Sequence, residues 1–169
     1  MKDKFIHAFM DVAERFSKLS SAKRLQVGAI IVKDDRIISI GYNGMPSGWD
    51  NNCEFTVFVT KEEAQGYDMP AQGYTETDQG NWTRLKTRPE VLHAESNALA
   101  KLARSSESGE GATMFITHQP CLECAKLIYQ SGISQVYFKE PYRLDTGLQF
   151  LKNSHVKIDQ VNEDRQKEH

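Results

Sequence analysis

Helix-like and strand-like segments alternate through the second half of the chain, and this alternation restricts the folds that it can adopt. The pattern predicts helices at Leu92–Arg104, Cys121–Ser131 and Thr146–Lys152. Short β-branched and aromatic runs predict strands at Thr113–Thr117, Gln135–Lys139 and Val156–Val161. Helices placed between strands in this way make crossovers between parallel strands and cover both faces of one sheet.

The first part of the chain predicts one helix followed by a β-hairpin. Apolar residues recur at helical spacing up to about Leu19, and Asp3 can cap this helix at its start. Strands are predicted at Gln26–Val32 and Arg36–Tyr42, and the first is so apolar that we expect it to be buried on both faces. The whole pattern predicts an α/β fold, a three-layer α/β/α sandwich with a central mixed sheet of about five strands.

The length of the chain sets the domain organisation that we expect. Its 169 residues fit one domain over residues 1–161, followed by a charged tail at residues 162–169. Residues from about 49 to 91 show no strong periodicity, and a short helix near Lys61–Gln65 is the only element that fits there. Long irregular segments are uncommon in compact domains and are usually functional or mobile, so the sequence predicts an insertion.

Composition excludes several classes of protein. Hydrophobic residues make up 39% of the chain and charged residues 26%, which is ordinary for a globular domain. A net charge of −2 provides no basic footprint for nucleic acid. The N-terminus lacks the apolar core of a signal peptide, and no stretch approaches the roughly 18 apolar residues of a membrane span. We therefore expect a cytoplasmic protein with no membrane and no nucleic-acid partner.

Two short motifs carry the chemistry of the chain. They are His93-Ala94-Glu95 and Pro120-Cys121-Leu122-Glu123-Cys124, and each opens a predicted helix. Either motif is weak alone, because a C-x-x-C pair also occurs in redox proteins and in structural zinc sites. Together, in this order and with a strand before the second, they match the signature of zinc-dependent nucleobase deaminases.

The number of ligands favours a catalytic zinc over a structural one. His93, Cys121 and Cys124 supply three nitrogen and sulfur ligands, whereas a structural zinc needs a fourth. The remaining cysteine of the chain, Cys53, lies in the insertion. Backbone N–H groups at a helix start also favour ionised thiols. We therefore expect one catalytic Zn²⁺ per chain.

Glu95 is the predicted proton carrier. In the first turn of a helix that begins at His93, its carboxylate can reach the same metal site and take a proton from water there. The predicted reaction is attack of hydroxide at C4 of cytosine, proton delivery by Glu95 and loss of ammonia. The competing interpretation is that Glu95 is simply an acidic residue favoured by the helix dipole.

With these residues in place, the chain resembles the deoxycytidylate (dCMP) deaminase family of the cytidine-deaminase-like superfamily. The resemblance runs from about Val27 to Gly132. It rests on Val27-Gly28-Ala29, Gly41-Tyr42-Asn43-Gly44-Met45-Pro46-Ser47-Gly48, His93-Ala94-Glu95-Ser96-Asn97-Ala98 and Thr117-His118-Gln119-Pro120-Cys121-Leu122-Glu123-Cys124-Ala125-Lys126. The second of these segments is the more specific pointer to dCMP, since many deaminases share the zinc residues.

The resemblance implies an activity, an assembly and a form of regulation. It implies conversion of dCMP to dUMP by a homohexamer that dCTP activates and dTTP inhibits. Asn43 matches the substrate-binding asparagine of the family. Effector binding is associated with the turn that contains Gly41, Tyr42, Asn43 and Gly44. Some members carry a second, structural zinc, but Cys53 stands alone here, so we expect none.

Several further residues are candidates by residue type and position. Lys23 and Arg24, just before the first strand, are candidates for binding the phosphate, and ordinary surface charge is an equal alternative. Arg104 is a candidate for a subunit contact. The aromatic residues that could stack on the base are Tyr137, Phe138 and Tyr142.

Two other functions remain open on the sequence alone. Deaminases of tRNA adenosine, guanine or a pterin-like ring share both zinc motifs, but the acidic net charge argues against tRNA. A non-catalytic zinc-binding interaction module is the other alternative. The presence of Glu95 and the missing fourth ligand argue against that module.

Overall fold

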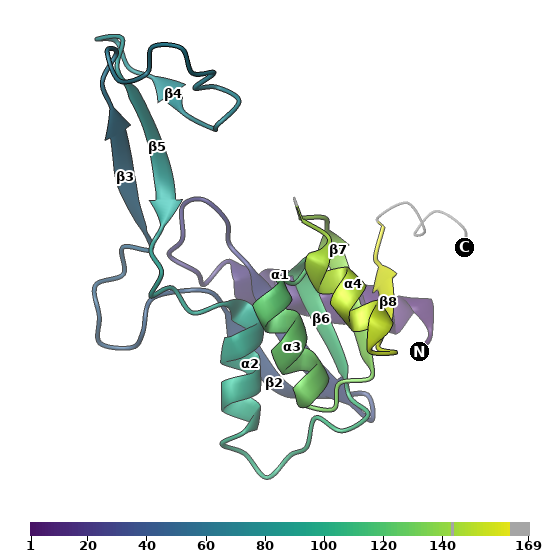
Figure 1. Ribbon diagram of the computed structural model, residues 1–169. Helices are drawn as coiled ribbons and strands as arrows, with labels where there is room; N and C mark the ends of the chain where they lie inside the picture. Colours follow the sequence, from purple (N-terminus) through teal and green to yellow (C-terminus); the bar gives the residue numbers. More distant parts are fainter. Residues whose placement is uncertain (143, 163–169) are drawn as a thin grey trace.

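The computed structural model describes residues 1–142 and 144–162, so residues 163–169 of the predicted tail lie outside the described part. A five-stranded sheet forms the centre of the body, in the order β2-β1-β6-β7-β8 (Figure 1). Its strands are β1 (Gly28–Lys33), β2 (Arg36–Tyr42), β6 (Thr113–His118), β7 (Gln135–Glu140) and β8 (Lys157–Gln160). Strand β1 is antiparallel to β2 and β6, whereas β6, β7 and β8 run parallel. The predicted mixed sheet is confirmed.

Helices cover both faces of this sheet. Along β1, Ile30 and Val32 pack against α1 (Asp3–Ser17), while Ala29 and Ile31 face the other three helices. Those three are α2 (Ala94–Leu102), α3 (Leu122–Gln130) and α4 (Thr146–Asn153). Successive side chains of a strand point to opposite faces, so the two sets of contacts define three layers. The predicted burial of the first strand on both faces is confirmed.

The N-terminal helix differs from the prediction at both ends. Its N-cap is Lys2, and Asp3 is the first helical residue. There the Asp3 carboxylate interacts favourably with the helix dipole but does not cap the helix. The helix ends at Ser17, two residues before the predicted Leu19. Within the described residues, no helix is long and apolar enough to cross a membrane.

The insertion is a small sheet, and the prediction of an irregular segment was wrong. Strands β3 (Glu54–Val59), β4 (Thr75–Glu76) and β5 (Trp82–Thr87) pair antiparallel in the order β3-β5-β4. This arm extends away from the body in Figure 1. The short helix predicted at Lys61–Gln65 is also wrong, because these residues form turns.

Close packing of α2 on β2 depends on Gly41. A Cβ atom at this position would lie 2.1 Å from the carbonyl oxygen of Ala94 and 2.6 Å from the backbone nitrogen of Ala98. Two hydrogen bonds fasten the same helix to the strand. Asn97 donates to the Tyr42 carbonyl at 2.8 Å, and Ser39 donates to the Ala98 carbonyl at 2.6 Å. Gly41 therefore has a structural reason to be glycine.

Replacing Gly41 with alanine is expected to destabilise the protein. The new methyl group collides with the helix backbone, so overpacking lowers the free energy of unfolding by about 1–3 kcal/mol. Gly44→Ala is the matched control, since a Cβ atom at Gly44 would meet no other atom within 4 Å and the φ of this residue is not positive. Urea denaturation of both variants measures the difference. Equal stability of the two variants would contradict the close-packing explanation.

Candidate active site

Two helix starts bring the predicted metal ligands together. His93 is the N-cap of α2 and Cys121 is the N-cap of α3, both in extended backbone conformation, and Cys124 lies in the first turn of α3. The Nδ1 atom of His93 lies 3.6 Å from the Cys121 sulfur and 3.4 Å from the Cys124 sulfur. All three donor atoms lie within 4.8 Å of one another. The sequence predicted this cluster correctly.

The spacing of these atoms fits a zinc ion. A tetrahedral zinc with bonds of about 2.3 Å to sulfur and about 2.0–2.1 Å to nitrogen holds sulfur and nitrogen about 3.6 Å apart. The two observed sulfur–nitrogen distances agree with this value. Among the described residues, no fourth His, Cys, Asp or Glu belongs to the cluster. The donor set therefore suits a zinc ion that keeps one coordination position open.

The three side chains are also electrostatically prepared for a cation. Hydrogen bonds from the Cys124 thiol and from His93 lower the pKa of Cys121 to about 3. The same hydrogen bond, together with burial, raises the pKa of Cys124, so the pair shares a proton. Hydrogen bonding to Cys121 raises the pKa of His93. A bound cation would replace these protons, since thiolate sulfur and neutral imidazole are the forms that ligate.

Glu95 lies beside the ligands without belonging to them. Its side chain is only 4% exposed, and this burial raises the pKa of its carboxyl group. The carboxyl group also hydrogen-bonds Cys124. A buried carboxyl group with a raised pKa holds a proton more readily than an exposed one and can release it to a reacting group, as general acid–base catalysis requires.

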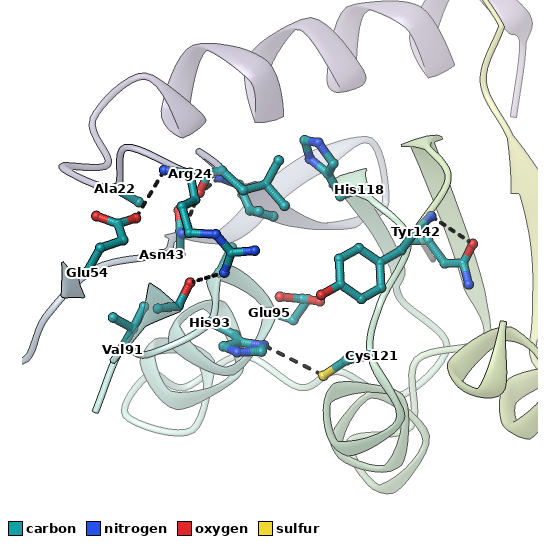
Figure 2. Close-up of a pocket in the computed structure, with 15 residues that line it drawn as sticks. Ala22, Arg24, Asn43, Glu54, Val91, His93, Glu95, His118, Cys121 and Tyr142 are labelled. Carbon is teal, nitrogen blue, oxygen red and sulfur yellow. Dashed lines mark hydrogen bonds between the residues drawn. The ribbon is translucent and has the colours of Figure 1, made fainter. Parts of the chain in front are cut away.

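These residues open into a cavity of about 250 Å³ between the body and the base of the arm. Figure 2 shows His93, Glu95 and Cys121 at one side of this cavity, facing Tyr142 and Arg24. Outside the metal site, the lining residues that offer polar side chains are Arg24, Asn43, Glu54, Thr87, His118, Gln119 and Tyr142. Burial lowers the pKa of His118, which favours its neutral form.

Asn43 lines the cavity, but its amide group is already engaged. Its Oδ1 atom accepts the Val27 N–H at 2.8 Å, and its Nδ2 atom donates to the Leu25 carbonyl at 2.8 Å. An amide group can make further hydrogen bonds beyond these two. Asn43 therefore holds the segment that precedes β1, whatever it also offers to a ligand.

Of the other candidate residues, some line the cavity and some do not. Arg24 lines the cavity, whereas Lys23 does not. Tyr142 lines it too, whereas Tyr137 packs on Phe115 at 5.0 Å between ring centres and Phe138 is buried in the sheet. Neither of the last two can stack on a molecule in this cavity.

Apart from Asn43, the predicted effector residues and the predicted subunit-contact residue do not line the cavity. Of the turn Gly41–Gly44, Asn43 alone lines the cavity. The Nζ atom of Lys101 lies over the Tyr42 ring, 5.6 Å from the ring centre. Arg104 is exposed just beyond the end of α2.

Four polar lining residues were not proposed as site residues from the sequence. Glu54 and Thr87 come from the arm, so only the unrecognised pairing of β3 and β5 could have revealed them. The Gln119 side chain accepts a hydrogen bond from the Tyr142 N–H at 3.3 Å and donates one to the Leu144 carbonyl at 2.7 Å. These two bonds position the loop after β7. Both Gln119 and His118 stand directly before the C-x-x-C motif, and this neighbourhood was the available signal.

Fold and site together define a class of protein. A His–Cys–Cys donor set at two helix starts, with a buried glutamate beside it, is the arrangement of the zinc-dependent deaminases. The family model of the cytidine and deoxycytidylate deaminase zinc-binding region matches residues 3–140. The chain belongs to the cytidine and deoxycytidylate deaminase family and is an enzyme of the deaminase class.

Individual relatives agree with this assignment. The deoxycytidylate deaminase of Enterobacteria phage T4 is 35% identical over 79% of this chain and 76% of its own length. That of Homo sapiens is 36% identical over 77% of this chain and 61% of its own. The crystal structure of dCMP deaminase from the cyanophage S-TIM5, in complex with dCMP and dUMP, is 38% identical. The structural match covers 95% of this chain and 99% of the cyanophage chain, with a TM-score of 0.75.

Replacing Asn43 with alanine is expected to destabilise the protein as well as alter the cavity. Loss of its two backbone partners costs about 1–3 kcal/mol of the free energy of unfolding, since the Val27 N–H loses its acceptor. Asn43→Asp keeps an acceptor for the Val27 N–H but points a carboxylate oxygen at the Leu25 carbonyl, so it too is expected to lower the stability. Chemical denaturation compares the two variants. A raised KM with unchanged stability in Asn43→Ala would show that Asn43 acts on the substrate alone.

Proposed function

We propose that this protein converts dCMP to dUMP, using one zinc ion held by His93, Cys121 and Cys124. The observation that carries the proposal is the buried Glu95 beside this donor set, on a cavity that also contains Arg24. Relatives named deoxycytidylate deaminase support dCMP as the substrate. The G-Y-N-G-M-P-S-G segment at residues 41–48 supports it too.

The metal site and Glu95 have separate roles in the proposed reaction. A zinc ion at this site would supply Lewis acidity, which makes hydroxide available from water near neutral pH. Glu95 takes a proton from the attacking water and delivers it to N3 of the base. It then takes the remaining proton from the new hydroxyl group at C4 and delivers it to the amino nitrogen. The C4–N bond breaks, so water and dCMP give dUMP and ammonia. The buried position of Glu95 keeps its proton from exchanging freely with solvent between these transfers.

The rest of the cavity binds and orients the nucleotide in this proposal. The Arg24 guanidinium is the phosphate ligand, since a planar cation with several donors suits phosphate oxygens. Tyr142 is the candidate for stacking on the base, and Asn43 for binding the sugar side of the substrate. Lys23 does not line the cavity, so it is not retained as a phosphate ligand in this proposal.

Ammonia release and loss of cytosine absorbance test the substrate. Purified, zinc-loaded protein should turn over dCMP, and a tRNA offered in parallel should remain unchanged. Zinc should measure one ion per chain by elemental analysis. Turnover of tRNA alone would support the alternative base deaminase. Absence of any turnover in the zinc-loaded protein would support a non-catalytic interaction module.

The variant Glu95→Gln separates proton transfer from metal binding. It removes the titratable group while keeping its shape, so kcat should fall by roughly 10²–10⁴-fold with the zinc content unchanged. Cys124→Ala serves as the contrasting variant, because it removes a ligand and should lose the zinc itself. Retention of full activity by Glu95→Gln would refute the assignment of the proton carrier.

Regulation and assembly extend the proposal. We propose a homohexamer activated by dCTP and inhibited by dTTP, with the turn Gly41–Gly44 at the effector site, on the family resemblance of residues 41–48. We also propose that residues 1–161 act as one catalytic unit. Its three free cysteines suit a reducing compartment such as the cytoplasm.

Steady-state kinetics with and without nucleotide triphosphates check the regulatory part. Added dCTP should lower the concentration of dCMP at half-maximal rate, and dTTP should raise it. Light scattering of the same samples should report the mass of six chains. Hyperbolic kinetics that neither triphosphate alters would remove the regulatory claim and leave the chemistry intact.

A further inference from the structure

The base of the arm contacts the segment that carries Arg24. Glu54 begins β3 and Thr87 ends β5, and the two residues face each other as a cross-strand pair. Directly opposite residues of antiparallel strands point to the same face, so both side chains can reach one neighbour. Here that neighbour is the irregular segment between α1 and β1. Figure 2 shows Glu54 and Arg24 side by side at the edge of the cavity.

Glu54 fixes the backbone of this segment. Its Oε1 atom accepts the N–H groups of Lys23 and Arg24, each at 3.0 Å. At the other end of the segment, Asn43 holds the backbone of Leu25 and Val27. The position of Arg24 therefore depends on one clamp from the body and one clamp from the arm.

Thr87 fixes the side chain of Arg24. The Nη1 atom of Arg24 donates to the Thr87 hydroxyl at 2.8 Å. Thr87 is neutral, and among the described residues no carboxylate forms an ion pair with Arg24. The guanidinium group is therefore oriented while its charge remains available. Arg24 lines the cavity, and in the described part of the chain its guanidinium group has no hydrogen-bond partner other than Thr87.

We propose that Thr87 and Glu54 are positioning residues for substrate binding, so that the base of the arm forms part of the nucleotide site. Thr87 orients the Arg24 guanidinium toward an anionic group of the substrate, and Glu54 fixes the backbone from which it projects. This inference rests on the proposed function, since it assigns the phosphate of dCMP to Arg24. It gives the arm a role in recognition, whereas the zinc chemistry stays within the body.

Thr87→Val tests the proposal with little change of shape. It removes only the hydroxyl that receives the Arg24 hydrogen bond, so KM for dCMP should rise about threefold to tenfold, with kcat and zinc content unchanged. Thr87→Ser keeps a hydroxyl and should restore the KM. Thr83→Val is the matched control, since it lies on the same strand and face, away from Arg24, and should leave both constants unchanged.

A second pair of variants tests whether the effect passes through Arg24. In an Arg24→Ala background, Thr87→Val should add nothing to the increase in KM. Glu54→Ala should raise KM more than Glu54→Gln, which keeps one acceptor oxygen. An equal effect of Thr87→Val with and without Arg24 would overturn the proposal, as would a fall in kcat at unchanged KM.

Failure of this inference can be distinguished from failure of the proposed function. If the wild-type protein does not deaminate dCMP, the proposed function itself is wrong. If it does, and Thr87→Val has the KM of the wild type, then only the positioning role is wrong. Thermal denaturation of each variant with zinc bound identifies any that lose activity by unfolding.

Discussion

The close approach of α2 to β2 is the constraint on which the rest of the site depends. At Gly41 the strand backbone touches the helix backbone, and no side chain can stand between them. Asn97 and Ser39 then fix the helix along and around its axis by hydrogen bonds to backbone carbonyls. His93 is the residue that precedes this helix, so its imidazole is placed by contacts made several residues away.

Packing of the chain also places Cys121, at the start of α3, in the second half of the predicted metal site. Strand β6 lies between β1 and β7 with its central residues buried, and the chain leaves it through Gln119 and Pro120 directly into α3. Neither His93 nor Cys121 forms a side-chain cap on its own helix. These N-cap side chains are therefore available for a metal, while the helix dipoles favour the ionised thiols. Burial of Glu95 works against stability, because water no longer solvates its carboxylate.

The sequence was sufficient for the elements whose signals are local. Alternating helices and strands predicted the sheet, and the two motifs predicted His93, Cys121 and Cys124 as neighbours, which the structure confirms. The arm was missed although β3 and β5 are as long as β1, because none of their residues is fully buried and no strongly apolar face marks them in the sequence. Such strands are stabilised by pairing with one another, and pairing between residues 54–59 and 82–87 leaves no periodic pattern in either segment alone.

Residues whose role depends on distant partners could not be predicted in the same way. The position of Asn43 in a recognisable turn indicated substrate binding, yet its amide group bonds a segment some 16 to 18 residues earlier in the chain. Thr87 gives no signal at all, since a threonine at the end of a strand is ordinary and its partner Arg24 lies 63 residues away. Only the folded chain places them together.

The site thus divides into two parts that differ in how the fold supports them. The predicted metal ligands and Glu95 lie at the starts of helices that pack against the buried sheet, and this packing fixes their positions. Arg24 instead stands on an irregular segment that has no such support, and loops of this kind usually carry recognition. Because the clamps on that segment come from Asn43 and from the arm, a change in the arm can displace Arg24 without disturbing His93, Cys121 and Cys124.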